Sequence, residues 1–464
     1  DNQDNQVLAY VGSADFHNAL DGGQVDGVRG IRSPGSTLKP LLYALAFDKG
    51  KVTPKSMIGD VPVYFSGYEP ENYDERFHGN VSVEYALSNS LNIPAVKLLN
   101  EIGVSSLVTS LRNSGFQQIS RDANKLGLST ILGGCGVRLE ELAGLYSAFA
   151  NGGTYRSHKF FAEQDMEDSL EIITPGASYL LTEILTQVTR PDLPLQWHNA
   201  QNLPKVAWKT GTSYGRRDAW SVGYNQKFTV AVWVGNFSGE GVPDLTGADI
   251  AAPLFFQIFN AVDYQTPKDW YNIPESVGFR YVCSESGDNP NHFCDNQIMD
   301  YFLKNVSAVK KCQHLRPAWV DAQGGFSYCT SCLPEGGYKQ EWYPNHSGPM
   351  LTYLQSHNIP YGEIPAHNPD CERVWVAGAP EITSPLHGTE YFVNESDSMQ
   401  MLLSAHVQND VKDIYWYIDN QFYKKAAYNE QVFFEPSQGK VKISCSDDKG
   451  RNTDIVVTVK KVGF

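Results

Sequence analysis

Three short motifs, each in a different local context, constrain this chain of 464 residues more than any other feature of its sequence. They are Ser36-Thr37-Leu38-Lys39, Ser90-Leu91-Asn92 and Lys209-Thr210-Gly211-Thr212-Ser213, in that order. Each motif taken alone recurs by chance in a long sequence. Their local contexts and their joint occurrence therefore decide what they mean.

The first motif follows a turn at Pro34-Gly35 and opens a helical pattern, because leucines recur at helical spacing from Leu38 to Leu45. Ser36 is thus predicted at the start of a helix, with Lys39 one turn further on and on the same face. A serine hydroxyl is a poor nucleophile until a base takes its proton, and a desolvated lysine is neutral enough to do so. Taken alone, an N-capping serine with a solvated lysine is the better interpretation.

The second motif lies between a helical run over Val83–Leu87 and another that starts near Pro94. Because proline disfavours the α region at the residue before it, Ile93, the motif is predicted to form a loop between two helices. Such a loop can point the hydroxyl of Ser90 and the amide of Asn92 into a cleft. By itself, an ordinary interhelical turn explains it better.

The third motif lies within a β run. A cation, two hydroxyls and a glycine that lets a ligand approach the backbone suit an edge strand that binds a carboxylate; a solvated edge strand is the alternative. Helix start, interhelical loop and strand, in this order, match a known catalytic signature of serine acyl transfer. Together the three motifs outweigh their separate structural explanations.

The length favours two or three domains, since one hydrophobic core seldom organises so many residues. Residues 1–265 alternate helical and β patterns, which is typical of an α+β domain with an antiparallel sheet and helices. The expected elements are a strand over Val7–Val11, helices over Leu139–Phe149, Ala177–Val188 and Pro253–Phe259, and a meander over Val206–Thr212, Ala219–Tyr224 and Phe228–Val234.

Residues 266–375 are rich in Pro, Gly, Asn and Cys with little periodicity, so we predict a loop-rich cysteine module there. Residues 376–464 are predicted to form an all-β, immunoglobulin-like sandwich. Its expected strands are Met399–Val407, Ile414–Ile418, Val432–Phe434, Val441–Cys445 and Ile455–Val459, with turns at Asp419-Asn420 and Asp448-Lys449-Gly450. Alternation in the second strand sends Trp416 to the core and Tyr415 and Tyr417 to the other face.

The net charge of −15, without any Lys/Arg-rich run, makes nucleic acid or an anionic membrane surface an unsuitable partner. The sequence contains no uninterrupted stretch of about 18 apolar residues, which is the length needed to span a bilayer. The chain starts at Asp1 without a signal peptide, so we expect a fragment whose membrane anchor lies upstream.

Residues 1 to about 265 resemble the transpeptidase domain of class A penicillin-binding proteins, on the blocks Gly30–Pro40, Ala86–Val96 and Trp208–Ser213. The cysteine-bearing segment and the β domain that opens at Pro380-Glu381-Ile382 resemble the 1C type of that class. Members of this type usually carry an anchor and a glycosyltransferase domain upstream. Neither is expected within this chain.

The resemblance implies a serine D,D-transpeptidase, with D,D-carboxypeptidase side activity, that acts on peptidoglycan stem peptides and is acylated by β-lactams. Ser36 would attack the carbonyl between the two terminal D-alanines, Lys39 would act as base, and Ser90 would relay a proton to the leaving amine. Asn92 would hold a substrate amide.

The resemblance also assigns the binding groups. Backbone N–H groups of Ser36 and Thr212 would form the oxyanion hole, and Lys209, Thr210 and Thr212 would receive the terminal carboxylate, with Gly211 lining the cleft. The implied location is the periplasm, at the outer face of the inner membrane. An envelope protein that binds the terminal sandwich is a further expected partner.

Two functions other than a transpeptidase are also open. A class A β-lactamase needs a deacylating glutamate, but no Glu-x-x-Leu-Asn segment lies between Asn92 and Lys209, and the nearest candidate, Glu140-Glu141-Leu142, is predicted to be a solvated part of a helix. A β-lactam sensor without turnover, or a scaffold that recruits wall factors, would be acylated in the same way. Only turnover of a stem peptide separates these from a transpeptidase.

The cysteine module allows two interpretations. Cys312-Gln313-His314 followed by Cys329-Thr330-Ser331-Cys332 fits a zinc site, whereas six cysteines in an exported protein pair off evenly as disulfides. We predict disulfides, no metal and no cofactor. The remaining histidines, which have no carboxylate or cysteine pattern around them, are predicted to be surface or core residues. The six cysteines are Cys283, Cys294, Cys312, Cys329, Cys332 and Cys371.

Overall fold

The structure is a computed structural model, in which the chain forms two compact units. The first unit contains Asp1–Asp60 and Glu71–Cys312, and the second contains Val61–Pro70 and Gln313–Phe464. It describes residues 1–464 except 64, 66, 67, 162, 165–168, 191–204, 264–269, 330, 331, 369, 370, 372–378, 395–399, 409, 410, 420, 449, 450, 463 and 464. The boundaries predicted at 265/266 and 375/376, Met399 at the start of one predicted strand, and Asn420, Lys449 and Gly450 of the predicted turns lie outside the described residues. No described helix combines the length and apolar character needed to cross a membrane.

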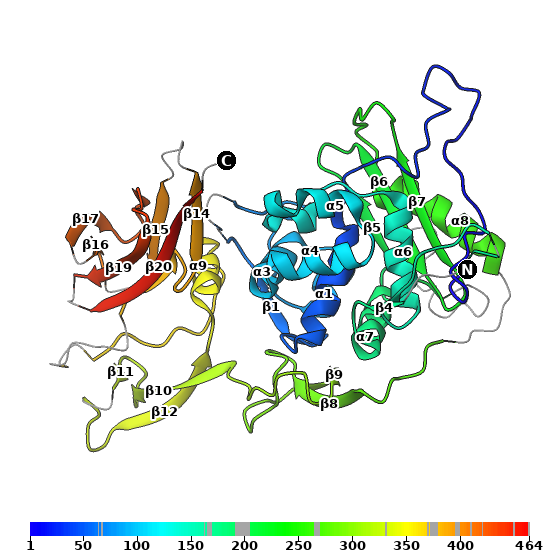
Figure 1. The fold of residues 1–464 in the computed structure, drawn as a ribbon. Helices are drawn as coiled ribbons and strands as arrows, with labels where there is room; N and C mark the ends of the chain where they lie inside the picture. Colours follow the sequence, from blue (N-terminus) through cyan, green and yellow to red (C-terminus); the bar gives the residue numbers. More distant parts are fainter. Residues whose placement is uncertain are drawn as a thin grey trace. The chain divides into compact units, whose positions relative to one another are not determined.

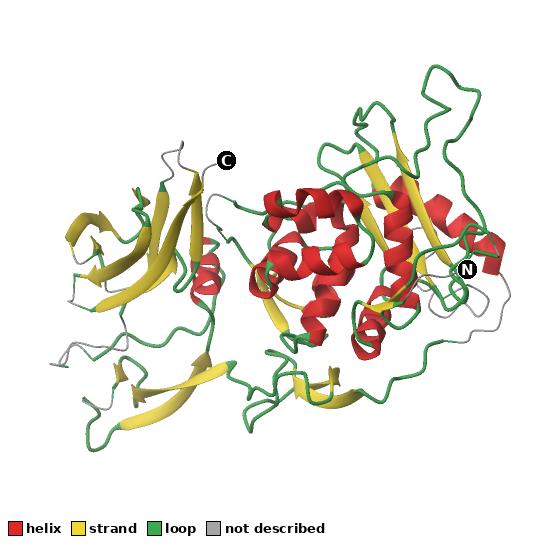
Figure 2. Ribbon diagram, viewed as in Figure 1, coloured by secondary structure: helices red, strands yellow, loops and turns green. Residues whose placement is uncertain are grey.

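Several helices of the first unit lie around one (Figures 1 and 2) that is buried along almost its whole length. This helix, α1 (Lys39–Asp48), is apolar on every side, and each residue from Lys39 to Phe47 is buried, as expected of a central helix. The others are α2 (Val83–Ser88), α3 (Asn92–Ile102), α4 (Val104–Asn113), α5 (Gln117–Asp122), α6 (Leu139–Ala150), α7 (Pro175–Leu185) and α8 (Ala252–Asp263). Two small antiparallel sheets of two strands each pair β1 (Met57–Asp60) with β2 (Gly79–Ser82) and β3 (Thr154–Tyr155) with β4 (Leu170–Glu171).

The predicted meander is confirmed as an antiparallel sheet of order β5-β6-β7. Aromatic side chains pack helices onto both faces: Trp208 contacts Phe255 and Phe256 of α8, whereas Tyr224 contacts Tyr146 and Phe149 of α6. β5 therefore presents one face to α8 and the other to the central helices. The strands are β5 (Ala207–Thr212), β6 (Asp218–Tyr224) and β7 (Thr229–Gly235).

The strand predicted over Val7–Val11 is wrong. In the described part of the chain this segment pairs with no strand, and the backbone N–H of Val7 instead donates to the carbonyl of Lys159 at 2.9 Å. A run of β-forming residues becomes a strand only if a partner edge lies within hydrogen-bonding reach.

The cysteine-bearing segment has more regular structure than predicted. β8 (Val277–Cys283) and β9 (Gln297–Leu303) form a hairpin in the first unit. The second unit contains a sheet of order β11-β10-β12, from β10 (Leu315–Asp321), β11 (Ser327–Tyr328) and β12 (Tyr338–Pro344), followed by α9 (Gly348–Ser356). Few residues of these strands are buried, so little apolar alternation marks them in the sequence.

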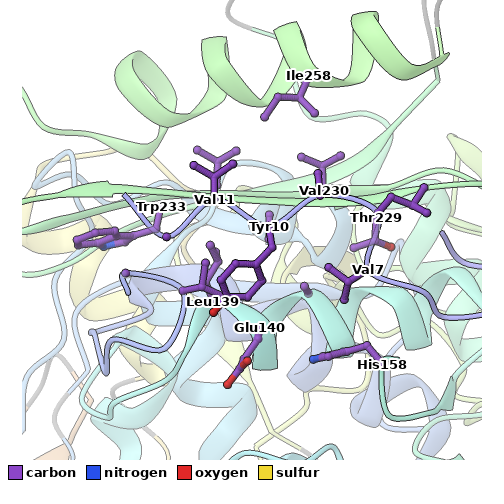
Figure 3. Close-up of a pocket in the computed structure, with 18 of the residues that line it drawn as sticks. Val7, Tyr10, Val11, Leu139, Glu140, His158, Thr229, Val230, Trp233 and Ile258 are labelled. Carbon is purple, nitrogen blue, oxygen red and sulfur yellow. The ribbon is translucent and has the colours of Figure 1, made fainter. Parts of the chain in front are cut away.

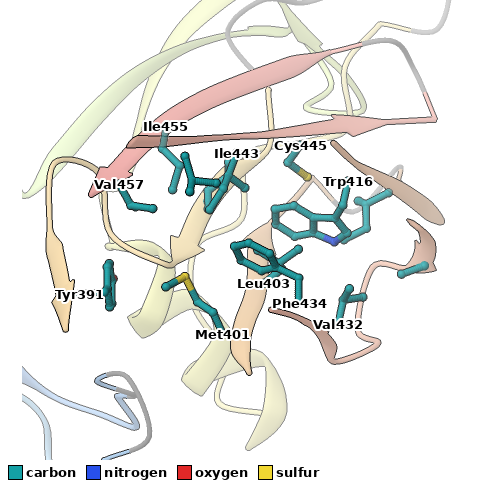
Figure 4. Close-up of a cluster of buried hydrophobic side chains, with 14 of the residues drawn as sticks. Tyr391, Met401, Leu403, Trp416, Val432, Phe434, Ile443, Cys445, Ile455 and Val457 are labelled. Atoms are coloured by element: carbon teal, nitrogen blue, oxygen red, sulfur yellow. The ribbon is translucent and has the colours of Figure 1, made fainter. Parts of the chain in front are cut away.

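The C-terminal sandwich is confirmed, with sheets of order β13-β15-β18 and β14-β20-β19-β16-β17. Trp416 is fully buried between them beside Leu403 and Cys445 (Figure 4), while Tyr415 and Tyr417 remain partly exposed on the other face, as predicted. The strands are β13 (Glu381–Ser384), β14 (Glu390–Asn394), β15 (Met401–His406), β16 (Asp413–Ile418), β17 (Gln421–Ala427), β18 (Val432–Phe434), β19 (Gly439–Asp447) and β20 (Asn452–Val462), with β14 and β20 parallel.

Candidate active site

Ser36 lies in a 3₁₀ turn over Gly35–Leu38 that runs directly into α1, close to the predicted helix start. The turn is held from several sides. Trp220 Nε1 donates to the carbonyl of Ser33 at 2.8 Å, and Tyr146 Oη donates to the carbonyl of Thr37 at 2.8 Å. These bonds fix the backbone on both sides of Ser36, so the fold sets the point from which its side chain projects.

Lys39 is fully buried and reaches from α1 to the connection between α2 and α3. Its Nζ donates to the carbonyls of Ser90 at 2.7 Å and Leu91 at 3.1 Å, and to Asn92 Oδ1 at 2.6 Å. Burial, reinforced by the nearby charge of Lys209, holds the pKa of Lys39 well below its ordinary value. This shift favours the neutral amine, which is the form that a lysine base requires.

Ser90 adopts a left-handed backbone conformation, with a φ of 59°. It follows α2 in the position that glycine usually takes, since Leu91 N–H donates to the carbonyl of Ala86 at 2.9 Å and Ser90 N–H donates to that of Leu87 at 3.1 Å. A serine in this conformation is strained, and such strain is concentrated at functional sites. The strained turn aims the Ser90 hydroxyl at Lys209.

The helix after Ser90 starts earlier than predicted. α3 begins at Asn92, so Ile93 is helical and the expected exclusion of Ile93 from the α region is wrong. Pro94 lies in the first turn of α3, where a backbone N–H has no intrahelical partner and its absence costs nothing.

Lys209 is buried in β5, and its Nζ donates to Ser90 Oγ at 2.7 Å and to the carbonyl of Thr210 at 3.1 Å. Burial lowers its pKa from 10.5 to about 7. Lys39 and Lys209 thus converge on the two sides of Ser90, one on its carbonyl and the other on its hydroxyl. All three motifs meet at this point.

β5 is an edge strand in the described part of the chain, as predicted. Ser213 N–H donates to Asp218 O in β6 at 3.0 Å, so the alternation of an antiparallel ladder turns the N–H of Thr212 toward the free edge. That edge faces the turn over Gly35–Leu38 that carries Ser36, the nucleophile turn, because a Cβ on Gly35 would lie 2.7 Å from Thr212 N. The side chains of Thr210 and Thr212 lie on the face opposite Lys209. A ligand along the free edge can reach both faces.

Gly211 is needed for a reason that the sequence did not indicate. A Cβ at this position would lie 2.4 Å from Pro34 O and 2.7 Å from Thr37 Cγ2, so the backbone that approaches Gly211 is the nucleophile turn itself. Thr212 Oγ1 accepts a hydrogen bond from Gly247 N–H at 2.9 Å, which ties β5 to the start of the segment before α8.

A buried polar network behind Lys39 was missed in the sequence. Asn92 N–H donates to Asn72 Oδ1 at 2.7 Å, Asn72 Nδ2 donates to both carboxylate oxygens of the fully buried Asp60 at 2.9 Å, and His78 Nδ1 lies 2.7 Å from Asp60 Oδ2. The prediction that no histidine has a carboxylate around it is therefore wrong for His78. Asn92 Nδ2 donates to the carbonyl of Glu71 at 2.7 Å, so this network positions the amide that holds Lys39.

The predicted solvation of Glu141 is also wrong, although the helix around it is confirmed. Glu141 is buried at the start of α6, where its carboxylate accepts hydrogen bonds from the backbone N–H groups of Gln117 and Arg138, both at 2.9 Å. Both of its carboxylate oxygens are thus engaged by backbone N–H groups, and Glu141 caps the helix.

A largely apolar cavity of about 620 Å³ lies elsewhere in this unit (Figure 3). It is lined by Val7, Tyr10 and Val11 on one side and by residues such as Val230 of β7 and Ile258 of α8 on the other. Because β7 is the edge of the sheet opposite β5, this cavity is not part of the site around Ser36.

The site combines a serine on a turn at the start of a helix with two buried lysines and a second serine between two helices. This arrangement places the protein in the class of serine acyltransferases. The chain belongs to the penicillin-binding protein transpeptidase domain family, whose model matches residues 1–260. Residues 370–459 match the penicillin-binding protein C-terminus family. The resemblance predicted from the sequence is thereby confirmed.

Individual relatives agree with this assignment. The chain is 38% identical over 297 residues to penicillin-binding protein 1C of Escherichia coli K12, covering 62% of this chain and 37% of that one. It is 34% identical over 255 residues to penicillin-binding protein 1F of Bacillus subtilis 168, covering 50% and 34%. The chain thus spans little more than a third of the length of either relative. The fold is similar to the crystal structure of penicillin-binding protein 1A from Haemophilus influenzae, with a TM-score of 0.52 at 19% identity over 62% of this chain and 50% of that one.

Proposed function

We propose that the first unit is a serine D,D-transpeptidase that cross-links peptidoglycan stem peptides and that β-lactams acylate. The observation that carries this proposal is the convergence of Lys39 and Lys209 on Ser90, beside the turn that holds Ser36. Two buried lysines with lowered pKa values, one at the carbonyl of Ser90 and the other at its hydroxyl, can accept and return protons. The family assignment favours this function over a sensor without turnover.

The reaction proceeds in two acyl transfers. Lys39 takes the hydroxyl proton as Ser36 Oγ attacks the carbonyl between the two terminal D-alanines, and Ser90 relays this proton from Lys39 to the leaving amine as that peptide bond breaks. The released D-alanine leaves an ester on Ser36. An acceptor amine of a second stem then attacks the ester, forms the cross-link and returns the proton to Ser36. Water as acceptor gives the carboxypeptidase side reaction.

The binding groups follow from the edge of β5. The N–H groups of Ser36 and Thr212 stabilise the oxyanion, since Thr212 N lies beside the nucleophile turn. Lys209, Thr210 and Thr212 receive the terminal carboxylate, with Gly211 behind them. Asn92 contacts a substrate amide and also positions Lys39 through Oδ1.

For the longer protein we propose an upstream membrane anchor and a glycosyltransferase domain, and a location at the periplasmic face of the inner membrane. Support comes from the resemblance to penicillin-binding protein 1C and from the short share of that relative that this chain covers. We also propose that the sandwich binds an envelope protein, through the face that carries Tyr415 and Tyr417.

Intact-mass spectrometry after exposure to penicillin tests the assignment of the nucleophile. The mass should rise by one drug per chain, Ser36→Ala should abolish the adduct, and Ser105→Ala, on the exposed side of α4, should keep it. An adduct on another serine would contradict the assignment. Release of D-alanine and formation of a cross-linked dimer from a pentapeptide substrate then separate a transpeptidase from a sensor, which would show neither.

A further inference from the structure

Four potential metal ligands gather in the second unit, although they come from two segments about 40 residues apart. The ligand atoms of Cys329, Cys332, His367 and Cys371 all lie within 4.8 Å of one another. Backbone hydrogen bonds join the segments: Ser327 N–H donates to the carbonyl of Ala366, and Asn368 N–H donates to the carbonyl of Ser327, both at 2.8 Å. The cluster is therefore built by the fold around it.

Three distances between the ligand atoms are close to the edges of a tetrahedron around zinc. Cys329 Sγ lies 3.6 Å from Cys332 Sγ and 3.9 Å from Cys371 Sγ, and Cys332 Sγ lies 3.4 Å from His367 Nε2. With Zn–S at about 2.3 Å and Zn–N at about 2.0 Å, the edges of a tetrahedron are about 3.8 Å between sulfurs and about 3.5 Å from sulfur to nitrogen. A disulfide would need about 2.05 Å between two sulfurs.

The predicted disulfides are wrong in this structure, and the reason is how the cysteines are distributed. All eight cysteines are described, and none is in a disulfide. Three of the six in the module, Cys283, Cys294 and Cys312, form a buried cluster in the first unit, and the other three belong to the second. An odd number in each place cannot pair off completely, whereas three thiolates and one imidazole complete a zinc site.

One of the ligand sulfurs accepts a backbone hydrogen bond. The backbone N–H of Cys329 donates to Cys332 Sγ at 3.3 Å, which holds these two residues in place relative to each other. Little else holds this part of the unit together: among the described residues from 313 to 371, Val320 and Met350 are the only buried hydrophobic side chains. A segment with so small a core needs a further cross-link.

We propose that Cys329, Cys332, His367 and Cys371 bind a structural zinc ion. Four protein ligands close the coordination sphere, which is typical of structural rather than catalytic zinc. The ion fastens the end of β11 to the segment that precedes the sandwich, and it takes the place of the disulfides and of the absence of metal predicted from the sequence. This proposal does not depend on the proposed transpeptidase.

Zinc content of the full chain tests the proposal. The chain is purified without chelators and without added reductant, and analysed by elemental analysis and native mass spectrometry. His367→Ala should lower the zinc content by about one ion per chain, and His367→Cys should restore it, since four cysteines also bind zinc. His357→Ala, at the exposed end of α9, is the matched control and should leave the content unchanged.

Three outcomes would overturn the proposal. They are a wild-type chain that contains no zinc and takes none up when zinc is added, a His367→Ala variant with the zinc content of the wild type, and a peptide map of the isolated chain in which Cys329, Cys332 or Cys371 is joined in a disulfide. The rescue by His367→Cys separates loss of a ligand from misfolding, because the cysteine variant changes the same residue and keeps a ligand.

Discussion

The strained backbone of Ser90 allows a sharp test of the site, because alanine and glycine at this position separate two effects. Both substitutions remove the hydroxyl that accepts a hydrogen bond from the buried Lys209, at a cost of about 1.5–3 kcal/mol. Alanine keeps the steric cost of a Cβ at a φ of 59°, whereas glycine relieves it. The larger entropy of glycine in the unfolded chain offsets part of this relief, and a net difference of about 1 kcal/mol remains. Ser90→Gly should therefore be more stable than Ser90→Ala by about 1 kcal/mol.

Urea unfolding followed by tryptophan fluorescence measures this difference in the free energy of unfolding, and acylation by a fluorescent penicillin measures the chemistry. Because neither variant can relay a proton, both should acylate more slowly than wild type by a similar factor, on the order of 10². An alanine variant as stable as the glycine variant would show that the backbone is not strained. A glycine variant that acylates at the wild-type rate would refute the role of the hydroxyl.

Four further predictions concern the rest of the chain. Lys39→Arg should slow acylation on the order of 10²-fold, because a guanidinium stays protonated, and a near wild-type rate measured with the same penicillin would point to another base. Burial lowers the pKa of Lys209 to about 7, so the unfolded chain binds more protons than the folded chain above that pH. The free energy of unfolding should therefore rise from about pH 7 to 10, and it should rise less steeply in Lys209→Met. Equal slopes of the two proteins in urea titrations would contradict this. Gly211→Ala should cost about 1–3 kcal/mol and slow acylation at least about tenfold by displacing the nucleophile turn, whereas Gly127→Ala, whose Cβ meets nothing within 4 Å, should do neither in the same two assays. Deletion of residues 376–464 should leave acylation within a few-fold of the full chain, and a truncated chain that folds cooperatively but is not acylated would show that the sandwich shapes the site.

Much of the fold could be predicted because its signals are local. The periodicity after Ser36 predicts α1, the alternation over the three runs from Val206 to Val234 predicts the meander, and alternation in β16 predicts that Trp416 is buried. The residue types of the three motifs, in their order, indicated the chemistry of the site before any distance was known. Each of these inferences depends on residues within a few positions of one another.

The tertiary structure decided what depends on residues far apart in the chain. It placed Lys39 and Lys209 on opposite sides of Ser90, and it left Val7–Val11 without a partner strand among the described residues. It also divided six cysteines into two groups of three, which no count of cysteines could reveal. The physical reason is the same in each case: a local pattern specifies which backbone conformation a segment favours, but the contacts that bury a charge, pair an edge or assemble a set of ligands form only when distant segments pack together.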